Sequence, residues 1–580
     1  MVRGRPGGQT VVMALSLSDN ARTVLKARYL RRNRDRKRVE TPEALFARVA
    51  AAVSEPELLY GLEADARRHR EAFFEMMTSL EFLPNSPTLM NAGTAMNQLS
   101  ACFVLPVGDS VEEIFEAVKQ MAMVQQSGGG TGFSFSRLRP RGDFVSSTGG
   151  RSSGPVSFMQ IFDCATANIR QGGKRRGANM GVLRATHPDI LDFVRAKRSE
   201  GAFESFNLSV LVDDDFMSAV CDGGKYALRH PRDGRVAGRL DAGQVFEEIY
   251  RAAWETGDPG LIFAGAVDRG NPTPHRGRIE ATNPCGEIPL LDYESCNLGS
   301  INLANMLEEN DRRIDWEKLK RTVHKGVRFL DNVIDVGRYP VSDIEKTTRR
   351  NRKIGLGVMG FAEMLIRLGI GYDTDEAAAR ADAVMAVIRK EAFRESCRLA
   401  EQRGVYPNWN GSVHQQRGER PRNAAVTAVA PTGTISIIAD TTPSIEPLFA
   451  LAYRRAHVLD GGALEEVNAL FRRRARQKGL DPDRILETVR GQGGLADVEE
   501  APEELKRVFK TALEISPENH LRVQEAFQRH VDNSVSKTIN VPEEVTPEDV
   551  ADAYRRAWEM NLKGITVYRY GSKSSQVLEI

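Results

Sequence analysis

Apolar and polar residues follow a helical spacing near the start of the chain. The segment TPEALFARVAAAV, which begins at Thr41, has a capping threonine, a proline at the first helical position and regularly spaced apolar residues. The basic run from Arg28 to Arg38 precedes it and is typical of a solvated helix face or arm. The pattern predicts a helical N-terminal region over residues 1–80.

From about residue 100, short apolar strands alternate with helical stretches and glycine-rich turns. At the end of the chain, SVSKTINV predicts a strand, Thr546 begins a helix, Gly564 ends it and ITVYRY predicts a second strand. A β-α-β unit of this kind requires parallel pairing. We therefore expect an α/β sheet or barrel over residues 81–580, with a helical insertion near 460–520.

Composition narrows the class of protein. In the 580 residues, 80 basic side chains are nearly balanced by 78 acidic ones, which argues against a nucleic-acid partner. Apolar runs are too short for a membrane span, and the N-terminus lacks the apolar core of a secretion signal. We expect a cytoplasmic protein with no membrane contact.

The cysteines indicate chemistry more than scaffolding. Six cysteines in so long a chain do not make a disulfide framework, and C-x-x-C is absent from the sequence. Paired close spacings of this kind usually mark a zinc site, so we expect no metal held by protein side chains. Any two thiols that pair in a reducing compartment would act as a transient redox couple.

The segment Asn283–Glu287, NPCGE, places an amide, a thiol and a carboxylate within five residues. Its proline and glycine predict a tight loop. Cys285 taken alone is better explained as a small buried hydrophobe in a turn. Cys296 follows, and Cys102 lies in LSACFVL, a predicted strand. Because none of these thiols has a histidine nearby in sequence, a thiolate nucleophile is less favoured than a thiol that carries a hydrogen atom.

Two glycine-rich stretches invite a nucleotide interpretation. Gly355-x-Gly357-x-x-Gly360 has the dinucleotide spacing, but a polar segment precedes it and no acidic residue follows a second strand. Close packing against a helix explains these glycines as well. The other stretch, 127–132, either lets a ligand approach the backbone or acts as a hinge between helix and strand.

Two further loops are suited to anions. The turn APTGTIS at 430–436 is an anion cradle if a helix begins within it, and otherwise an unliganded helix cap. The loop RQGGKRRGANMG at 170–181 carries four cations. It is either a solvated loop or a clasp for a phosphorylated ligand.

Eight sequence blocks, spread over nearly the whole chain, match one known family. They are LPNSPTLMNAG, SGGGTGFSFSRLRP, RQGGKRRGANMG, NPCGEIPL, SCNLGSINL, RKIGLGVMGFAEML, APTGTISIIADTTPSIEP and GITVYRYGS. Through these blocks the chain resembles ribonucleotide reductases, most closely the adenosylcobalamin-dependent type.

The resemblance implies a ten-stranded α/β barrel, preceded by a small helical domain, with Cys285 on a finger loop at its centre. It assigns Cys285 as the thiyl radical that abstracts the 3′ hydrogen of the ribose. Glu287 is the expected proton acceptor, and Asn283 holds the ribose hydroxyls. Cys102 and Cys296 are the expected redox pair, which gives up two electrons and ends as a disulfide.

The same resemblance implies ligand contacts. Loops near 141–154 and 170–181 are expected to bind a deoxynucleoside triphosphate effector at a homodimer interface, through Asp143, Lys174, Arg175 and Arg176. The expected substrate contacts are Ser86, Ala101, Cys102, Gly130, Asn283, Pro284, Cys285, Gly286, Glu287, Pro431, Thr432, Gly433, Thr434, Ile435 and Ser436.

The source of the radical separates the subtypes. Two-subunit enzymes carry adjacent tyrosines where this chain reads Tyr568-Arg569-Tyr570, and glycyl-radical enzymes lack the carboxylate of Glu287. Adenosylcobalamin is therefore the implied cofactor, and a ribonucleoside diphosphate the implied substrate. The alternatives are the large subunit of an iron- or manganese-radical reductase and a catalytically silent nucleotide-binding regulator.

The C-terminus departs from the pattern. Close relatives usually continue into a tail with a cysteine pair that reduces the active-site disulfide, and this tail is absent from the sequence, which ends at Ile580. Either the chain is truncated, or the tail is a separate polypeptide, or an external reductant such as a thioredoxin-like protein or another thiol enters directly.

Overall fold

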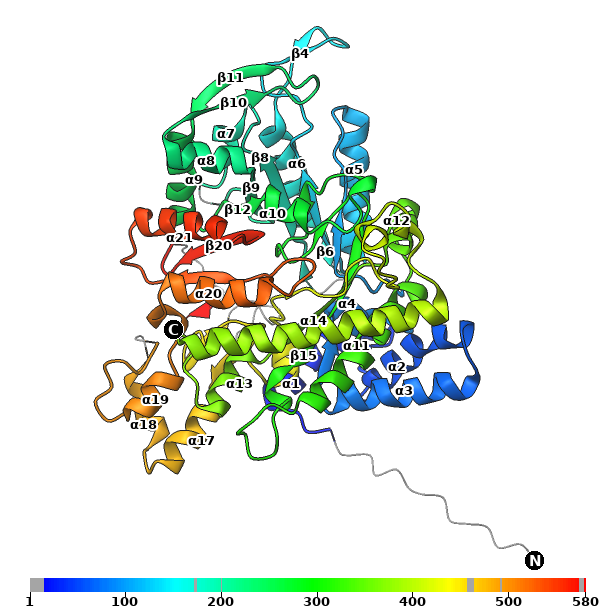
Figure 1. The fold of residues 1–580 in the computed structure, drawn as a ribbon, viewed down its shortest axis with the longest axis vertical. Helices are drawn as coiled ribbons and strands as arrows, with labels where there is room; N and C mark the ends of the chain where they lie inside the picture. The colour runs from blue at the N-terminus through cyan, green and yellow to red at the C-terminus, as the bar shows by residue number, and fades with distance from the viewer. Residues whose placement is uncertain are drawn as a thin grey trace, which may run out of the picture.

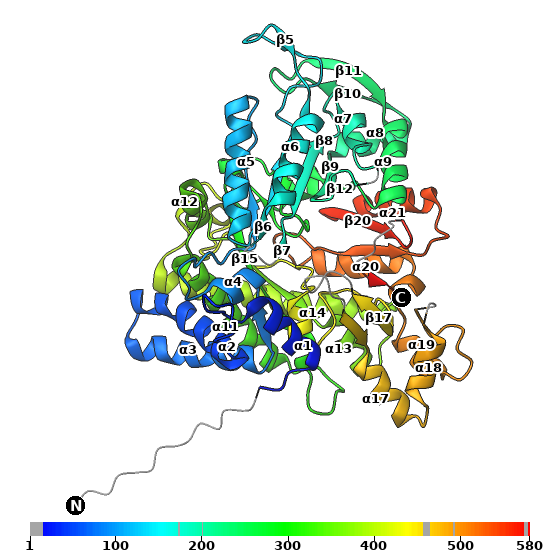
Figure 2. The same ribbon diagram turned by 180° about the vertical axis from the view of Figure 1, so that it is seen from behind.

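Helices make up the N-terminal part of the chain. The computed structural model describes residues 15–171, 175–199, 201–455, 464–490, 493–572 and 578–579. As predicted, the Thr41 hydroxyl caps a helix by accepting a hydrogen bond from the backbone N–H of Ala44. Figures 1 and 2 show the second and third N-terminal helices packed together on one side of the lower half, with the first helix nearer the middle. These helices are α1 (Asp19–Val24), α2 (Pro42–Ser54) and α3 (Glu63–Thr78).

The centre of the molecule is a large sheet of ten strands. Five of them run parallel to one another in the order β2, β3, β8, β9 and β12. Long helices cover the outside of the sheet (Figure 1). The five strands are β2 (Cys102–Val104), β3 (Gly130–Ser134), β8 (Asn179–Arg184), β9 (Phe206–Val212) and β12 (Gly260–Phe263).

A second parallel group completes the ring. It comprises β15 (Ser295–Asn302), β16 (Ile354–Met359), β19 (Thr538–Val541) and β20 (Gly564–Arg569). The extended segment 427–429 joins β16 to residue 535 by single parallel bridges. Antiparallel pairs β2–β15 and β12–β20 connect the two groups. With 427–429 counted and the outer strand β1 (Phe82–Pro84) left aside, each half has five members, which confirms the predicted barrel.

Helices outside the barrel support this arrangement. The predicted C-terminal β-α-β unit is present, because α21 connects β19 to its parallel neighbour β20. Among the described residues, every helix is too short or too polar to cross a lipid bilayer. The main outer helices are α5 (Val111–Gln126), α6 (Pro155–Asn168), α9 (Ala242–Thr256), α11 (Trp316–Val336), α12 (Ser342–Asn351), α13 (Phe361–Leu368), α14 (Asp375–Arg403), α17 (Ala469–Gln477), α18 (Pro482–Thr488), α19 (Glu503–Val508), α20 (Pro517–Gln528) and α21 (Pro547–Glu559).

A hairpin lies inside the barrel. Its strands β13 (Ala281–Thr282) and β14 (Pro289–Leu290) belong to the same apolar cluster as inward-facing residues of β2, β8, β12 and β15. The backbone of the hairpin passes so close to β3 that a Cβ atom on Gly132 would lie 1.7 Å from the carbonyl oxygen of Thr282. The barrel can hold the hairpin only because this position has no side chain.

Two of the three dinucleotide-like glycines, Gly355 and Gly357, lie on strand β16, and Gly360 follows it as the N-cap of α13. A Cβ atom on Gly357 would lie 2.1 Å from the carbonyl oxygen of Ala428, and one on Gly355 would meet Leu298 at 2.3 Å. Close packing therefore accounts for these glycines, as the alternative interpretation held. The packing partners are the strand β15 and the extended segment 427–429, not the helix that the sequence suggested.

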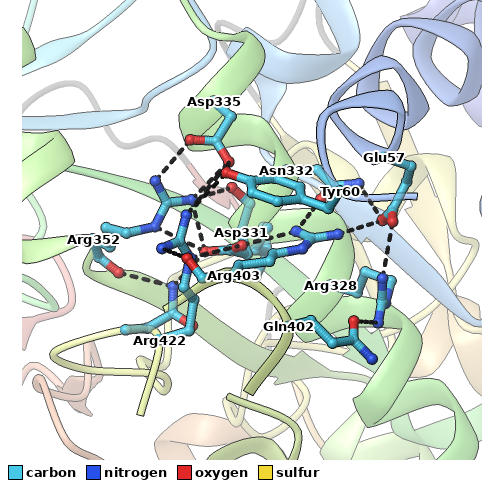
Figure 3. Close-up of polar contacts among 12 residues, drawn as sticks. Glu57, Tyr60, Arg328, Asp331, Asn332, Asp335, Arg352, Gln402, Arg403 and Arg422 are labelled. Atoms are coloured by element: carbon cyan, nitrogen blue, oxygen red, sulfur yellow. Dashed lines mark hydrogen bonds and ion pairs between the residues drawn. The ribbon is translucent and has the colours of Figure 1, made fainter. Parts of the chain in front are cut away.

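A buried cluster of charges joins the N-terminal helices to the barrel (Figure 3). Glu57 accepts a hydrogen bond from Arg328 at 2.9 Å, and Asp331 on α11 pairs with Arg352 at 2.8 Å and with Arg403 at 3.0 Å. Burial alone would raise the pKa of Asp331, but the surrounding guanidinium groups outweigh it and hold that pKa well below its usual range. The cluster therefore keeps its charges and fixes the helices against the barrel.

Candidate active site

The NPCGE segment forms the tip of the hairpin inside the barrel. The backbone N–H of Gly286 donates to the carbonyl of Asn283 at 3.1 Å, and Gly286 has a φ of +81°. The side-chain oxygen of Asn283 accepts from the N–H of Ile288 at 3.0 Å. The predicted tight loop is confirmed, and it leaves the Cys285 side chain exposed at the tip.

Cys102 and Cys296 are direct neighbours where the two parallel groups of strands meet. They lie opposite each other in the antiparallel pair of β2 and β15, and both are buried. Opposed residues in such a pair have Cα atoms about 4.5–5.5 Å apart, which is within the range of a disulfide. These two thiols can therefore be oxidised to a disulfide with little movement of the backbone.

Polar contacts link the hairpin to this pair. The Cys102 thiol donates to Glu287 Oε1 at 3.8 Å, and Asn283 Nδ2 donates to Cys102 Sγ at 3.2 Å. Among the described residues, the other carboxylate oxygen, Glu287 Oε2, is buried without a hydrogen-bond partner. This oxygen is therefore free to accept a hydrogen bond or a proton from a bound ligand.

Burial governs the ionisation of the site. It raises the pKa of Glu287 to about 7, against the lowering effects of hydrogen bonds from Asn283 and Cys102. Burial, and then the nearby Glu287 carboxylate, raise the pKa of the Cys102 thiol well above its ordinary value. Burial likewise raises the pKa of Cys296. Both thiols therefore remain protonated at neutral pH.

Cys285 borders two cavities. One has a volume of about 350 Å³, the other about 490 Å³, and they share Pro284, Cys285 and Pro431. The smaller cavity brings together most of the predicted substrate contacts. Its lining includes Ser86, Ala101, Cys102, Gly130, Asn283, Pro284, Cys285, Glu287, Pro431, Thr432, Gly433, Thr434 and Ile435.

Gly286 and Ser436 do not line the smaller cavity. Gly286 lines the larger one. Ser436 is buried in the short helix α16 (Ile435–Ile438), and its hydroxyl has no hydrogen-bond partner among the described residues. A helix therefore does begin within the hydroxyl-rich turn, as an anion cradle requires.

Two hydroxyl groups of the predicted substrate contacts have partners within the protein. Thr432 has a φ of +52°, and its hydroxyl accepts from the N–H of Ser444 at 2.6 Å. Such a conformation is unusual for a β-branched residue and is held by its surroundings. Ser86 shares a 2.7 Å hydrogen bond with the hydroxyl of Tyr29.

The predicted effector residues lie apart from the two cavities. Asp143 contacts His230 Nε2 at 3.2 Å, next to the hairpin β4 (Phe144–Val145) and β5 (Gly150–Arg151). Arg175 and Arg176 form strand β7, which pairs with β6 (Arg170–Gln171). Lys174 lies outside the described residues.

Sequence reasoning missed residues that support the site. Asn207 on β9 donates to the carbonyl of Pro284 at 2.8 Å and so holds the tip of the hairpin. Lys353 and Glu294 form a fully buried ion pair of 2.8 Å beside Cys296. The signal for Asn207 was present, because it is the first polar residue in the apolar strand FNLSVLV.

Comparison with known proteins is consistent with this geometry. Residues 15–97 match the family model for the ribonucleotide reductase all-alpha domain, and residues 100–568 match the model for the ribonucleotide reductase barrel domain. A class Id ribonucleotide reductase alpha subunit from Actinobacillus ureae has a similar fold, with a TM-score of 0.78 at 24% identity over 96% of this chain and 97% of that one.

Relatives of higher identity span nearly the whole chain. A vitamin B12-dependent ribonucleoside-diphosphate reductase from Mycobacterium tuberculosis (strain CDC 1551 / Oshkosh) is 50% identical over 97% of this chain and 81% of its own length. A protein of the same name from Thermoplasma acidophilum is 47% identical over 97% of this chain and 80% of its own length. The chain therefore belongs to the ribonucleotide reductase family.

Proposed function

We propose that this chain reduces ribonucleoside diphosphates to 2′-deoxyribonucleotides with adenosylcobalamin as cofactor. The observation that carries the proposal is that two thiols, an amide and a carboxyl group line one cavity, and that a third thiol, Cys296, lies opposite Cys102 behind it. Relatives named as vitamin B12-dependent ribonucleoside-diphosphate reductases, at 47–50% identity, support both the cofactor and the substrate class.

Each side chain has a role that its position explains. Cys285, exposed at the hairpin tip, carries the hydrogen atom taken from C3′ of the ribose and returns it at the end of the cycle. Glu287, whose pKa lies near neutrality, accepts the proton of the 3′ hydroxyl, and Asn283 holds the ribose hydroxyls. Cys102 and Cys296 supply two electrons and two protons as the 2′ hydroxyl leaves as water, and they end as a disulfide.

The larger cavity gives the reactive group of the cofactor access to Cys285, although it is too small to hold the whole of adenosylcobalamin. It reaches Cys285 from the side of Asn207 and Tyr568, and its volume of about 490 Å³ is typical of a small-molecule site. Adenosylcobalamin, when bound, supplies the hydrogen-atom acceptor that converts the Cys285 thiol to a thiyl radical. Residues that would face it include Met180, Asn207, Phe449 and Tyr568. Their role in the chain is to exclude water around the reacting sulfur.

The alternatives have less support. A reductase that imports its radical needs two adjacent tyrosines, whereas here Arg569 separates Tyr568 from Tyr570. A silent regulator has no need of buried, paired thiols next to a carboxyl group with a pKa near 7.

Regulation and assembly complete the proposal. The effector is a deoxynucleoside triphosphate, bound near Asp143 and the loop at 170–181 in a homodimer. The helix α5 supports this assembly, because Val111 and Phe115 lie one helical turn apart and are 60% and 50% exposed. Figure 1 shows α5 along the edge of the upper half. The final reductant is a dithiol, such as that of a thioredoxin-like protein.

An anaerobic turnover assay tests the function. With adenosylcobalamin and dithiothreitol, and with no second protein, the chain is expected to convert ribonucleoside diphosphates to deoxynucleotides. Ribonucleoside triphosphates, tested in parallel, determine the phosphorylation level. Activity that appears only after addition of an iron or manganese radical subunit would contradict the proposal.

The Cys285→Ser variant provides the matched test. It is expected to lose product formation by at least a thousandfold, because an oxygen atom does not replace sulfur as the hydrogen carrier. Nucleotide binding, measured by calorimetry, should remain within about twofold of wild type. Retained turnover would exclude Cys285 as the radical carrier.

A further inference from the structure

The two thiols of the redox pair differ in their surroundings. Cys102 lines the smaller cavity, where a small thiol can reach it. Cys296 is fully buried and, within the described part of the chain, lines neither of the two cavities that meet at Cys285. A reductant that enters through the cavity therefore meets the sulfur of Cys102 first.

Cys296 has a cationic neighbour on its other side. In the parallel register of β15 and β16, Asn297 is opposite Ile354, so the preceding residues Cys296 and Lys353 are also neighbours. The Cys296 thiol contacts the carbonyl oxygen of Lys353 at 3.6 Å. Cys296 thus lies between Cys102 on one strand and Lys353 on the next.

The Glu294 carboxylate holds the Lys353 side chain near Cys296. Its ammonium group donates to Glu294 Oε2 at 2.8 Å, and both side chains are at most 2% exposed. Glu294 lies two residues before Cys296, immediately before β15 begins at Ser295. The Glu294 carboxylate also accepts from the backbone N–H of Leu291 at 2.7 Å and from Asn351. A buried ion pair with this many hydrogen bonds has a fixed geometry.

The charges around Cys296 change the pKa of its thiol. Burial raises the pKa of the Cys296 thiol, and the Glu294 and Glu287 carboxylates add to that increase. The Lys353 charge acts in the opposite direction and favours the thiolate. A thiol with a lower pKa is the better leaving group in disulfide exchange. The position of Lys353 therefore matters when the disulfide is broken.

We infer that the disulfide is reduced in one direction, with Cys102 as the attacked sulfur and Cys296 as the leaving group, and that Lys353 positions charge for this step. The inference rests on the proposed redox role of the pair. A thiolate of a dithiol attacks Cys102 Sγ, the Cys102–Cys296 bond breaks, and its electron pair moves to Cys296. Cys296 then takes up the proton lost by the attacking thiol. The second thiol of the reductant displaces Cys102 and closes its own disulfide, and Cys102 takes up the proton of that thiol, so two electrons and two protons pass to the protein.

Trapping of the mixed disulfide tests the direction. The purified chain is oxidised with diamide, treated briefly with 2-mercaptoethanol, quenched in acid and alkylated with iodoacetamide after denaturation. Peptide mass spectrometry is expected to find the mercaptoethanol adduct on Cys102 and the alkyl group on Cys296. The opposite distribution would overturn the inference. Failure of diamide to form the Cys102–Cys296 disulfide would instead count against the proposed redox pair itself.

Substitution of Lys353 tests the charge. Lys353→Met is expected to slow the reduction of the preformed disulfide by dithiothreitol at least tenfold, measured by thiol release without nucleotide or cofactor. The double variant Lys353→Met/Glu294→Gln removes the unpaired carboxylate as well. It should remain slow if the positive charge matters, and recovery of the wild-type rate would show a merely structural role. Lys197→Met, which removes a similar pair with Asp258 at 2.9 Å, should leave the rate unchanged.

Discussion

Glu287 is buried beside the Cys102 thiol, where burial raises its pKa to about 7. A carboxyl group with this pKa is half ionised at neutral pH, which suits a general base. The same shift destabilises the folded chain. Since the unfolded pKa is about 4.3, the native state binds more protons than the unfolded state between about pH 4 and 7, so stability falls as the pH rises through this window.

Glu287→Gln is therefore expected to stabilise the protein at pH 8 by about 1–3 kcal/mol, while abolishing nucleotide reduction. At pH 4 the wild-type carboxyl is mostly protonated and the two proteins should unfold alike. Unfolding in urea, followed at both pH values, measures the difference. Equal stabilities at pH 8 would show that the carboxyl group does not carry the raised pKa.

Single residues differ in how well the sequence predicts them. Cys285, Glu287 and Asn283 were recognisable because they lie together in one short block. Cys102 and Cys296 required the family resemblance, since 194 positions separate them in sequence and only the β2–β15 pairing brings them together. Lys353 gave no signal, because its role depends on a strand register that the sequence does not reveal.

At the level of elements, the hairpin inside the barrel depends on a close approach to β3. The hairpin strand β13 passes over Gly132, where a Cβ atom would lie within 1.7 Å of a backbone oxygen. The hairpin backbone cannot move away from an added methyl group as the end of a flexible side chain could. The position of Cys285 is therefore coupled to a glycine on a neighbouring strand.

Gly132→Ala is expected to displace the hairpin and reduce turnover at least a hundredfold, with a loss of stability of about 1–3 kcal/mol. Turnover and thermal unfolding together measure both effects. The matched control is Gly238→Ala on β11 (Val236–Asp241), where the nearest atom to an added Cβ is 3.8 Å away. An active, stable Gly132→Ala protein would contradict the close approach.

Elements were predictable where their pattern is local. The capped helix α2 and the C-terminal β-α-β unit follow from capping, spacing and turn residues within one stretch of chain. In the sequence, the segment 427–429 is recognisable only as part of an apolar stretch. In the structure it completes the ring by pairing with β16 and residue 535. Its partners lie about 70 and 106 residues away, so local patterns do not identify it.

At the scale of the whole molecule, the buried charge cluster of Figure 3 fixes the N-terminal helices to the barrel. Asp331 lies at its centre and faces Arg352, Arg403 and Arg422. Because its pKa is held low in the folded state, its contribution to stability is present above the unfolded pKa of about 3.9 and is lost as the pH falls through the lower folded value.

Asp331→Asn is expected to destabilise the protein by about 3–5 kcal/mol at pH 7, since it leaves three buried guanidinium groups poorly compensated. The difference from wild type should shrink as the pH falls below about 4, and urea unfolding over a pH series measures it. The control Glu317→Gln removes an exposed charge from the same helix, where it pairs with Lys320, and should leave the stability unchanged.

Two separate cavities meet at Cys285, and this has a practical consequence for inhibition. A compound that fills the chamber beside Ser86 and a compound that fills the chamber beside Tyr568 do not compete for the same space, yet each lies against the same sulfur atom. Two weak binders of unlike chemistry, joined by a linker that passes Cys285, would gain affinity from their connection alone. The boundary that the two cavities share at Cys285 is therefore the place at which to join the two halves of a bivalent inhibitor.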